Sequence, residues 1–471
     1  MSLFTWEYVD PAPGEPVGPK QTLSPLRTLG IGAQHVVAMF GATFVFPIVM
    51  GLDPNLAIMF SGICTVLFLL ICQNKVPSYL GTSASFVAGV AAIRAQGGDS
   101  ADVTGGIMVA GVVLALVGVI VHFGGSRIIH AILPPAVTGA VVMLIGLNLA
   151  PVVAGIYWPQ DQWVALATAT FMVCAAVLLP GFWARIAVFL ALIFGYAVSW
   201  AADKIFGTIN SALPGQNLVD AAGKPCAQEG LYCHPASVDH DRVSWAFVKA
   251  ADWVGFPSGK LADGVSVVHA PSFSLTFILL VLPGVIALIA ENTGHVKAVA
   301  EMTGTDLDPY MGRAIGADGL ATAFASAFGG SPTTTYAENI GVMGATKVYS
   351  TAAYYVAAVV AILLGLCPKF GAIVSATPGG VLGGITVVLY GMIGLVGAKI
   401  WVENKIDFGN PVNLVGLAAG LIAGIGGVTL TITDDFSLGG IALGTILVIA
   451  YFHLVKRGGV RQRAEEVTKV L

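Results

Sequence analysis

The chain has 471 residues, of which 56% are hydrophobic and only 10% are charged, and its formal net charge is −4. Soluble domains carry roughly a quarter charged residues, so this composition excludes a soluble globular protein, and the charge balance gives no sign of a nucleic-acid-binding surface. With a mean hydropathy of +0.84, the chain is expected to be an integral membrane protein. No signal peptide is visible, because residues 1–28 are polar and contain prolines, so the first apolar segment is expected to direct insertion.

Fourteen segments are candidates for membrane-spanning helices, which need about 20 apolar residues each. The third and tenth segments are short and are interrupted by proline and hydroxyl-bearing residues. The predicted fold class is therefore an all-α membrane protein with fourteen transmembrane segments and short strands in segments 3 and 10. In chain order the segments lie near residues 29–51, 54–73, 78–96, 104–124, 128–151, 160–180, 184–205, 271–302, 311–329, 332–347, 350–372, 377–400, 411–430 and 436–456.

Similarity between the two halves of the chain predicts an internal repeat. Residues 133–155 resemble residues 377–398, since each stretch begins with proline and continues with small residues and a long apolar run. The interrupted residues 77–90 resemble residues 331–344 in the same way. Seven spans per half is an odd number, so the two repeats are expected to have opposite orientations in the membrane. The expected organisation is an N-terminal segment (1–28), a first repeat (29–205), a loop (206–270), a second repeat (271–456) and a tail (457–471).

The distribution of basic residues predicts that both termini are cytoplasmic. With the N-terminus inside, Lys and Arg gather on the inward loops and in the tail, whereas the short outward loops hold mainly Asp. Arg94 and Lys369 are exceptions to this pattern. The long loop of residues 206–270 is then expected on the extracytoplasmic side.

Two cysteines, Cys226 and Cys233, share this polar loop. A disulfide between them is the preferred interpretation if the loop faces an oxidising compartment. A zinc site that uses His234 is less favoured, because no second pair of ligands at metal spacing accompanies it.

The two interrupted segments are predicted to form a binding site. Short, proline-interrupted segments at matching places in two halves point to the binding site of a transporter. Extended pieces are expected at Thr82–Phe86 and Thr333–Tyr336, where two short strands can pair and satisfy their backbone amides. The half-helices that follow would point their N-termini, with free N–H groups, at the centre of the bilayer. A polar ligand could dock there.

Two glutamates within the predicted spans are the main candidate functional residues. An ionisable group at membrane depth costs roughly 2.5–3.5 kcal/mol on insertion scales. Glu338, at the start of the second half-helix, is therefore interpreted as ligand-binding, with a simple helix cap as the alternative. Glu291 lies inside the eighth segment, and His295 shares its helix face one turn later. This pair is expected to handle a proton, although a local pair near a wet helix end is the competing interpretation.

The first predicted helix carries Gln34 and His35, for which a supporting role at the site and plain interhelical packing are both open. Ala42, further along the same helix, would leave space for a flat ligand. The chain contains neither GxxxxGK[ST] nor HExxH, so neither an ATP-driven pump nor a zinc protease of that type is expected.

These motifs resemble those of the nucleobase–ascorbate transporter family, also called nucleobase:cation symporter 2. The family signature has Gln, Glu or Pro, then Asn-x-Gly, four residues, and then Thr followed by Arg, Lys or Gly. Glu338-Asn339-Ile340-Gly341, followed by Thr346-Lys347, matches it fully. The Gln-His pair of the first helix and the stretch AENTGHVKAVAEMTG are also similar to the family's motifs, and the resemblance covers nearly all of residues 25–455. Glu at the first signature position is typical of the family's uracil permeases, and Gln of its xanthine and urate carriers.

The resemblance implies a fourteen-span fold with a core domain and a gate domain, and a homodimer. It implies proton-coupled uptake of uracil or a related pyrimidine by alternating access across the bacterial cytoplasmic (inner) membrane. The implied partners are the nucleobase (uracil, with thymine or xanthine as further candidates) and the lipid bilayer. Neither a cofactor, a metal, nucleic acid nor an enzymatic activity is expected, and the implied coupling ion is H⁺. The alternatives are a xanthine or other purine symporter and, from a different class, an anion channel or exchanger of the same architecture, which should not need acids at its ligand site.

The resemblance also assigns site residues, position by position. Glu291 and Glu338 match the family's substrate-binding carboxyls, and His295 matches the histidine beside the first; we expect Glu291 to bind the base and to exchange the coupled proton with help from His295. Uracil permeases often have Phe at the position of Ala84 and Gly at the position of Ala337. The smaller Ala84 would enlarge the pocket, which would then admit thymine or a purine. The full set of implied substrate-binding residues is Glu291, Glu338, Ala84, Ala337, Ala42, Tyr336, Phe86 and Tyr390, supported by Gln34, His35 and Asn339.

Overall fold

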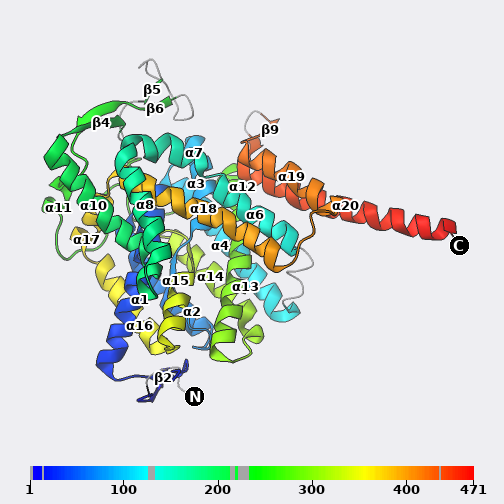
Figure 1. Cartoon of the computed structure of the whole chain (residues 1–471), viewed down its shortest axis with the longest axis horizontal. Coiled ribbons are helices and arrows are strands. Elements are labelled where there is room, and N and C mark those ends of the chain that lie inside the picture. Colours follow the sequence, from blue (N-terminus) through cyan, green and yellow to red (C-terminus); the bar gives the residue numbers. More distant parts are fainter. Residues whose placement is uncertain are drawn as a thin grey trace.

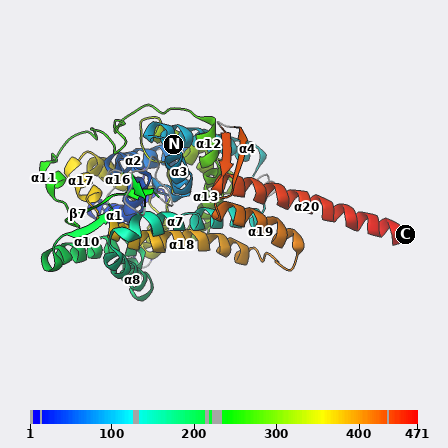
Figure 2. The ribbon, with the colours of Figure 1, turned by 90° about the horizontal axis from the view of Figure 1, so that it is seen from above.

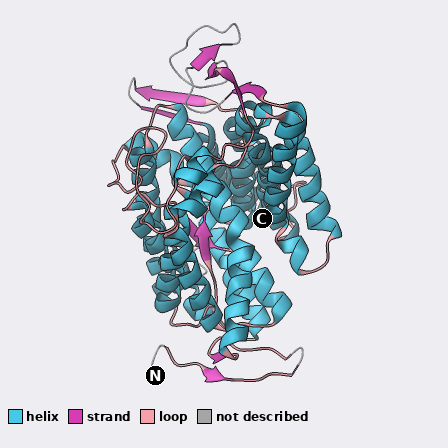
Figure 3. Ribbon diagram, turned by 90° about the vertical axis from the view of Figure 1, so that its left-hand side faces the viewer, coloured by secondary structure: helices cyan, strands magenta, loops and turns pink. Residues whose placement is uncertain are grey.

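The computed structural model describes residues 4–12, 15–125, 133–212, 218–220, 233–433 and 436–470. Its body is built of packed helices, with short strands at the two ends and in the middle (Figure 1; Figure 3). The helices are α1 (Pro25–Met50), α2 (Pro54–Ile71), η1 (Ala84–Phe86), α3 (Val87–Ala95), α4 (Ser100–Gly124), α6 (Pro135–Leu147), α7 (Ala150–Val152), η2 (Val153–Tyr157), η3 (Trp158–Gln160), α8 (Gln162–Leu178), α9 (Phe182–Arg185), α10 (Ala187–Phe206), α11 (Ala246–Ala250), α12 (Leu275–Val281), α13 (Pro283–Thr303), η4 (Asp308–Tyr310), α14 (Met311–Ser326), α15 (Ala337–Thr346), α16 (Thr351–Gly365), α17 (Pro368–Ser375), α18 (Gly379–Glu403), α19 (Pro411–Ile425) and α20 (Gly440–Val470).

The described strands are short and lie in two-stranded pairs. Four of the pairs are antiparallel, and the pair near the N-terminus is parallel. The pairs are β1 (Glu7–Tyr8) with β2 (Gln21–Thr22), β3 (Leu80–Thr82) with β8 (Thr333–Thr335), β4 (Ile209–Ala212) with β7 (Ser237–His240), β5 (Leu218–Asp220) with β6 (Cys233–Pro235), and β9 (Thr429–Thr433) with β10 (Phe436–Gly439).

Several helices are long and apolar enough to cross a membrane. Among the described residues there are seven, and the pair α16 and α17, bent by 82° at its break, makes an eighth if it is one span. Each of the fourteen predicted segments contains at least one described helix, although some of these helices are shorter than a full span. The chain is therefore a mostly helical, multi-pass membrane protein.

The helices pack into two groups. In the first group α4 packs along α14, and α2 packs against α14, α16 and α1. In the second group α18 packs against α6, α8 and α10, and α19 packs along α20. Seen from above, α1, α2 and α16 lie on one side of the body, and α8, α18 and α19 lie on the other (Figure 2). Both interrupted segments belong to the first group, since β3 contacts α1 and α2 and β8 contacts α14.

Glycines allow α4 and α14 to approach very closely. A Cβ atom added at Gly118 would lie 2.2 Å from the backbone nitrogen of Gly316, and one added at Gly319 would lie 2.3 Å from that of Ala115. Small residues permit such backbone contact between membrane helices, where packing rather than the hydrophobic effect drives association. The chain contains 59 glycines, and those at this crossing allow the two helix backbones to touch.

We expect Gly118→Val to force α4 away from α14, because the obstructing atoms belong to the backbone and cannot rotate aside. Overpacking of this kind costs about 1–3 kcal/mol or more. Thermal unfolding of the purified protein in detergent measures the effect. Gly30→Val on α1 is the matched control, since a Cβ there meets no atom within 4 Å. Equal unfolding temperatures for the two variants would contradict this account of the crossing.

The two interrupted segments meet in the middle of the helical body, as predicted. β3 and β8 pair antiparallel, with Gly81 opposite Thr334, and a strand is visible within the body (Figure 3). The predicted limits of the strands were wrong by a few residues. The strand expected at Thr82–Phe86 begins earlier, at Leu80, and residues 84–86 form the 3₁₀ helix η1, because the Ser83 hydroxyl accepts a hydrogen bond from the Ser85 amide. The second strand ends at residue 335, and the next residue is the N-cap of α15.

The N-terminal strands and the strands of the loop 206–270 lie at opposite ends of the body (Figure 1; Figure 3). That these two ends lie on opposite sides of the membrane stays a prediction. Which end faces the cytoplasm stays a prediction. Cys226 lies outside the described residues, so its disulfide with Cys233 also stays a prediction.

Candidate functional site

Two carboxyl groups come together where the interrupted segments cross. Glu291 lies on α13, which packs against both β8 and α15, and Glu338 lies in the first turn of α15. The two side chains are half-buried, and the helices that carry them pack against each other. The Thr334 hydroxyl of β8 donates a hydrogen bond to Glu291 Oε2 over 3.3 Å. The structure therefore places these two acids in one polar region inside the first helix group.

The starts of both half-helices adjoin the ends of the strand pair. The Ser83 amide donates to the Pro332 carbonyl (2.9 Å), and the Tyr336 amide donates to the Tyr79 carbonyl (3.0 Å), so the backbone of each strand end is satisfied. Ala337, the first residue of α15, is exposed although it lies within the helical body. No side-chain hydrogen bond from the N-cap residue covers the start of α15. Backbone N–H groups at a helix start without such a cap can bind a ligand.

Glu338 lies in the first turn of α15, where the helix dipole favours an acid. The capping and the ligand-binding interpretations of Glu338 therefore both remain open, and they require an experiment to separate them.

His295 lies on the same face of α13 as Glu291, but its described hydrogen bond goes elsewhere. Its Nδ1 lies 2.7 Å from the hydroxyl oxygen of Thr335, the last residue of β8. The next threonine back, Thr334, carries the bond to Glu291. The imidazole and the carboxyl are thus linked through neighbouring threonines of one strand rather than directly.

A third acid, Asp318 on α14, was missed by the sequence analysis. Its side chain is completely buried, and its Oδ2 accepts a hydrogen bond of 2.6 Å from Asn292 Nδ2. Its Oδ1 has no hydrogen-bond partner among the described residues. Asp318 is also within electrostatic reach of Glu291. The signal was present in the sequence, since an acid in the middle of a predicted span marks a functional site by default.

Gln34 and His35 lie on α1, and the structure shows what His35 does. Asn339 Nδ2, on α15, donates to the His35 carbonyl over 3.0 Å, and the His35 ring packs on Tyr354 with centroids 4.2 Å apart. Both His35 and Asn339 are fully buried, whereas Gln34 is half-buried. These contacts hold α15 against α1. They fit plain interhelical packing of His35 as well as a supporting role at the site, so the supporting role stays a prediction.

Tyr336 closes one side of the region. Its hydroxyl donates to the Thr82 carbonyl over 2.8 Å and accepts from Thr43, and its ring covers Gly81, where a Cβ would lie 2.4 Å from the ring. Ala42, the residue before Thr43, is buried. Ala84, at the start of η1, is half-buried.

Phe86 and Tyr390 lie differently from the other predicted residues. Phe86 is fully buried, and its ring packs beside Gly284 of α13. Tyr390, on α18 in the second group, borders a hollow of about 420 Å³ with residues of α6 and η2. Its hydroxyl has no hydrogen-bond partner among the described residues. The described hydrogen bonds therefore do not join Tyr390 to either carboxyl.

A larger hollow of about 500 Å³ lies between α10 and α17 and is lined by apolar residues. None of the three acids Glu291, Glu338 and Asp318 borders it. The chemistry of the carboxyl cluster, rather than the size of a hollow, therefore identifies the candidate site. Among the described residues no group of His, Cys, Asp and Glu is arranged to hold a metal ion.

The apolar helices and the polar cluster at the crossing of two broken segments define a membrane transport protein. Solved transporter structures share this fold. The chain matches the structure of SLC26A9 with a TM-score of 0.61 and 13% identity, over 91% of this chain and 65% of that one. It matches the transmembrane domain of the cyanobacterial bicarbonate transporter BicA with a TM-score of 0.55 and 12% identity, over 91% of this chain and 97% of that domain. At these identities the likeness shows the fold alone.

The chain belongs to the xanthine/uracil permeases, a group described as "Permease family", which it matches over residues 26–433. It is 41% identical to "Putative pyrimidine permease RutG" of Escherichia coli (strain K12), over 94% of this chain and 92% of that protein. It is 33% identical to "Uracil permease" of the same strain, over 94% of each chain. It is also 33% identical to "Uracil permease" of Bacillus caldolyticus, over 88% of this chain and 89% of that protein. The predicted family is thereby confirmed, and the protein is a permease rather than an enzyme.

Proposed function

We propose that this permease carries uracil or a related pyrimidine nucleobase into the cell, together with a proton, across the bacterial cytoplasmic membrane. The observation that carries the proposal is the pair Glu291 and Glu338, which lie on the contacting helices α13 and α15 where the two broken segments cross. The names of the relatives support a pyrimidine substrate. Glu rather than Gln at the first signature position supports the same choice.

The polar groups of the region suit the edge of a pyrimidine ring. Uracil presents N–H donors and carbonyl acceptors in the plane of the ring. Glu291 and Glu338 can accept from N–H groups, and backbone amides at the starts of η1 and α15, near Ala84 and Ala337, can donate to the carbonyls. The ring of Tyr336 supplies one wall.

The proton is assigned to Glu291, with His295 and Asp318 as its neighbours. A carboxyl that can bind the base only in one protonation state couples the movement of the base to that of the proton. His295 would assist through Thr335, to which it is hydrogen-bonded. Asp318 is the alternative carrier, because one of its oxygens has no partner among the described residues.

Transport is proposed to proceed by alternating access, with the first helix group as the core domain and the second as the gate domain. The antiparallel pairing of β3 with β8 supports two inverted seven-span repeats, because two repeats of opposite orientation bring their equivalent segments together head to tail. The fourteen-span topology, the cytoplasmic termini and the homodimer implied by the family are parts of the same proposal.

A purine substrate is the second candidate, and Ala84 favours it. This residue is half-buried at the start of η1 and leaves more room than the Phe often found there in uracil permeases. Thymine and xanthine are larger than uracil and would fit into that additional space. An anion exchanger shares the fold, but acids at the ligand site would repel its substrate.

Uptake of radiolabelled uracil into proteoliposomes, at several pH values and with competitors, tests the proposal. We expect accumulation driven by an inward proton gradient, abolished by a protonophore, and inhibited by unlabelled uracil or thymine. Stronger inhibition by xanthine than by uracil would replace the pyrimidine with a purine. Exchange of bicarbonate or chloride without any uracil uptake would overturn the proposal.

A further inference from the structure

The two basic residues that depart from the charge pattern of the chain are both contacted by the loop 206–270. Lys369 Nζ lies 5.0 Å from the centroid of the Trp253 ring, and the Lys369 amide donates to the Asp252 carbonyl over 2.8 Å. Arg94 forms an ion pair with Asp263, with 2.7 Å between Nη1 and Oδ2. The loop therefore contacts both basic residues: Asp263 pairs with Arg94, and the Trp253 ring lies against Lys369.

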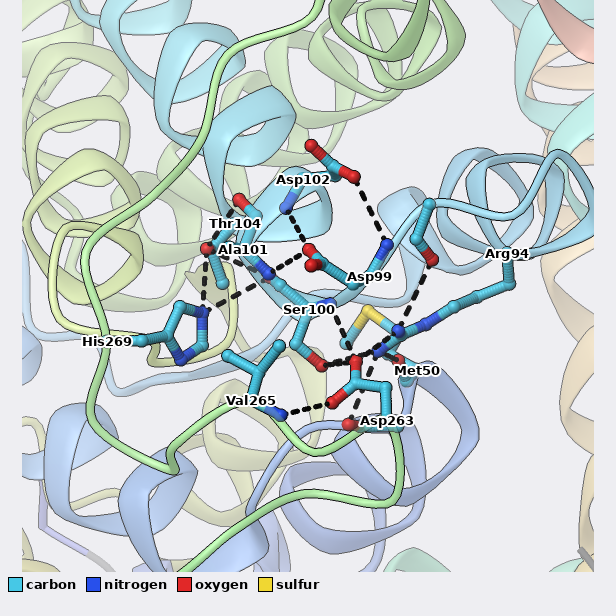
Figure 4. A network of polar contacts seen from close by, with 12 residues as sticks. Met50, Arg94, Asp99, Ser100, Ala101, Asp102, Thr104, Asp263, Val265 and His269 are labelled. Carbon is cyan, nitrogen blue, oxygen red and sulfur yellow. Dashed lines mark hydrogen bonds and ion pairs between the residues drawn. The ribbon is translucent and has the colours of Figure 1, made fainter. Parts of the chain in front are cut away.

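The Arg94 guanidinium joins the ends of three helices (Figure 4). Arg94 lies in the last turn of α3. Its Nη2 donates to the Ser100 hydroxyl at the start of α4 (2.7 Å) and to the Met50 carbonyl at the end of α1 (3.3 Å). A cation at a helix C-terminus is favourable. The Arg94 guanidinium lies at the C-terminal ends of α3 and α1 and also at the N-terminal start of α4. Its geometry depends on the counter-ion that faces it.

Asp263 is that counter-ion, and it is itself firmly held (Figure 4). Its Oδ2 accepts from the Ser100 amide (2.7 Å) and hydroxyl (2.6 Å) as well as from Arg94, and its Oδ1 accepts from the Val265 amide (3.1 Å). The two charged side chains are 27% and 22% exposed, so the pair is shielded from much of the solvent. His269 makes a second attachment, with Nε2 3.0 Å from the Thr104 hydroxyl oxygen.

The position of α3 matters because its other end reaches the candidate site. The helix has only nine residues and follows η1 directly, and η1 begins at Ala84. A helix this short is not stable by itself, so its tertiary contacts decide where it lies. Its buried face packs on α12 and α1, and polar contacts hold its two ends. At the inner end the Ser83 amide donates a hydrogen bond to the Pro332 carbonyl. At the outer end the Arg94 side chain holds α3 through its contacts with Met50, Ser100 and Asp263.

We propose that Asp263 is a positioning residue for nucleobase binding: through Arg94 it fixes the outer end of α3 and thereby the place of the Ala84 amide at the site. This inference rests on the proposed function for its effect on transport. Asp263 touches no substrate. It acts along a rigid helix on an amide that meets the base.

The Asp263 carboxylate is available across the working pH range. Burial raises its pKa, but the hydrogen bonds from Ser100 and Arg94 outweigh burial, and the net pKa falls from 3.8 to about 2. A carboxyl with a depressed pKa contributes stability at pH values above the usual 3.8 and loses it as the pH falls through about 2. The Arg94 pairing therefore does not change between pH 5 and 8, so Asp263→Asn should not alter the pH profile of uptake.

The test compares Asp263→Asn with Asp252→Asn. Asp252 is an exposed acid of the same loop, and its backbone carbonyl, which the substitution leaves in place, accepts its described hydrogen bond from the Lys369 amide. Uracil uptake gives KM and Vmax, and amide hydrogen exchange of residues 84–95 reports on α3 without any substrate. We expect Asp263→Asn to raise KM about fivefold or more, a typical coupling between distant sites, with Vmax changed less. Exchange in α3 should quicken. Asp252→Asn should change neither, and Asp263→Glu should restore part of the affinity.

The variant Arg94→Gln removes the other side chain of the ion pair and is the reference for the double variant. If the two residues act as a pair, the double variant Arg94→Gln/Asp263→Asn should be no worse than Arg94→Gln alone. Additive effects, or exchange in α3 unchanged by Asp263→Asn, would overturn the inference. If the unaltered protein takes up no uracil, the proposed function fails. Faster exchange in α3 would then still support the fastening of this helix by Asp263.

Discussion

Glu291→Gln is expected to abolish proton-driven accumulation of uracil. The amide keeps the size of the side chain but can neither take up nor release a proton, and it replaces an acceptor oxygen with a donor. Loss of a hydrogen bond to a charged group costs about 1.5–3 kcal/mol, which is roughly a 10- to 150-fold loss of affinity. Uptake into proteoliposomes with and without a pH gradient, together with equilibrium binding, measures both effects.

Glu301→Gln is the matched control, because Glu301 lies on the same helix but is exposed near its end. It should leave both uptake and its pH dependence unchanged. Asp318→Asn then locates the proton. If uptake by Asp318→Asn remains coupled to the gradient while that of Glu291→Gln does not, Glu291 carries the proton. Gradient-driven uptake that survives Glu291→Gln and disappears with Asp318→Asn would move that role to Asp318.

Glu338→Gln is expected to weaken uracil binding by about 1.5–3 kcal/mol, the range for a hydrogen bond to a charged group. The dissociation constant should therefore rise roughly 10- to 150-fold. Because Gln at this position is typical of the family's xanthine carriers, xanthine should inhibit the variant more strongly than it inhibits the unaltered protein. Equilibrium binding of labelled uracil, with xanthine as competitor, gives both numbers.

Glu338→Asp separates ligand binding from helix capping. Asp interacts with a helix N-terminus at least as well as Glu, so a purely capping role predicts full retention of uracil affinity. If the Glu338 carboxyl binds the base, the shorter Asp side chain holds the carboxyl further from the ring, and the affinity for uracil falls. Retained affinity in both Glu338→Asp and Glu338→Gln would remove Glu338 from the substrate-binding residues.

Much of the candidate site was readable from the sequence because membrane burial makes charge costly. Glu291 and Glu338 stand out against apolar surroundings, and the two proline-interrupted stretches predicted the strand pair that the structure shows. The same reasoning, applied evenly, would have found Asp318. The error in the first strand came from local side-chain chemistry, since Ser83 caps η1 where an extended residue was expected.

The pair Glu291 and His295, predicted from their shared helix face, shows a limit of another kind. Residues four apart share a helix face, but this spacing does not say whether a third group binds one of them better. β8 supplies two threonine hydroxyls to this face, and His295 bonds to one and Glu291 to the other. Only the packing of α13 on β8 decides these partners.

The sequence by itself determined the membrane character, the family and the two acids, because composition, the signature around Glu338 and the cost of buried charge are local properties of the chain. The tertiary structure decided which groups meet. Asp318 joins Asn292 across 26 residues, His295 joins Thr335 across 40, and Asp263 joins Arg94 across 169. Hydrogen bonds act only over about 3 Å, so such pairings follow from how helices and loops come together in space, and no single stretch of sequence contains them.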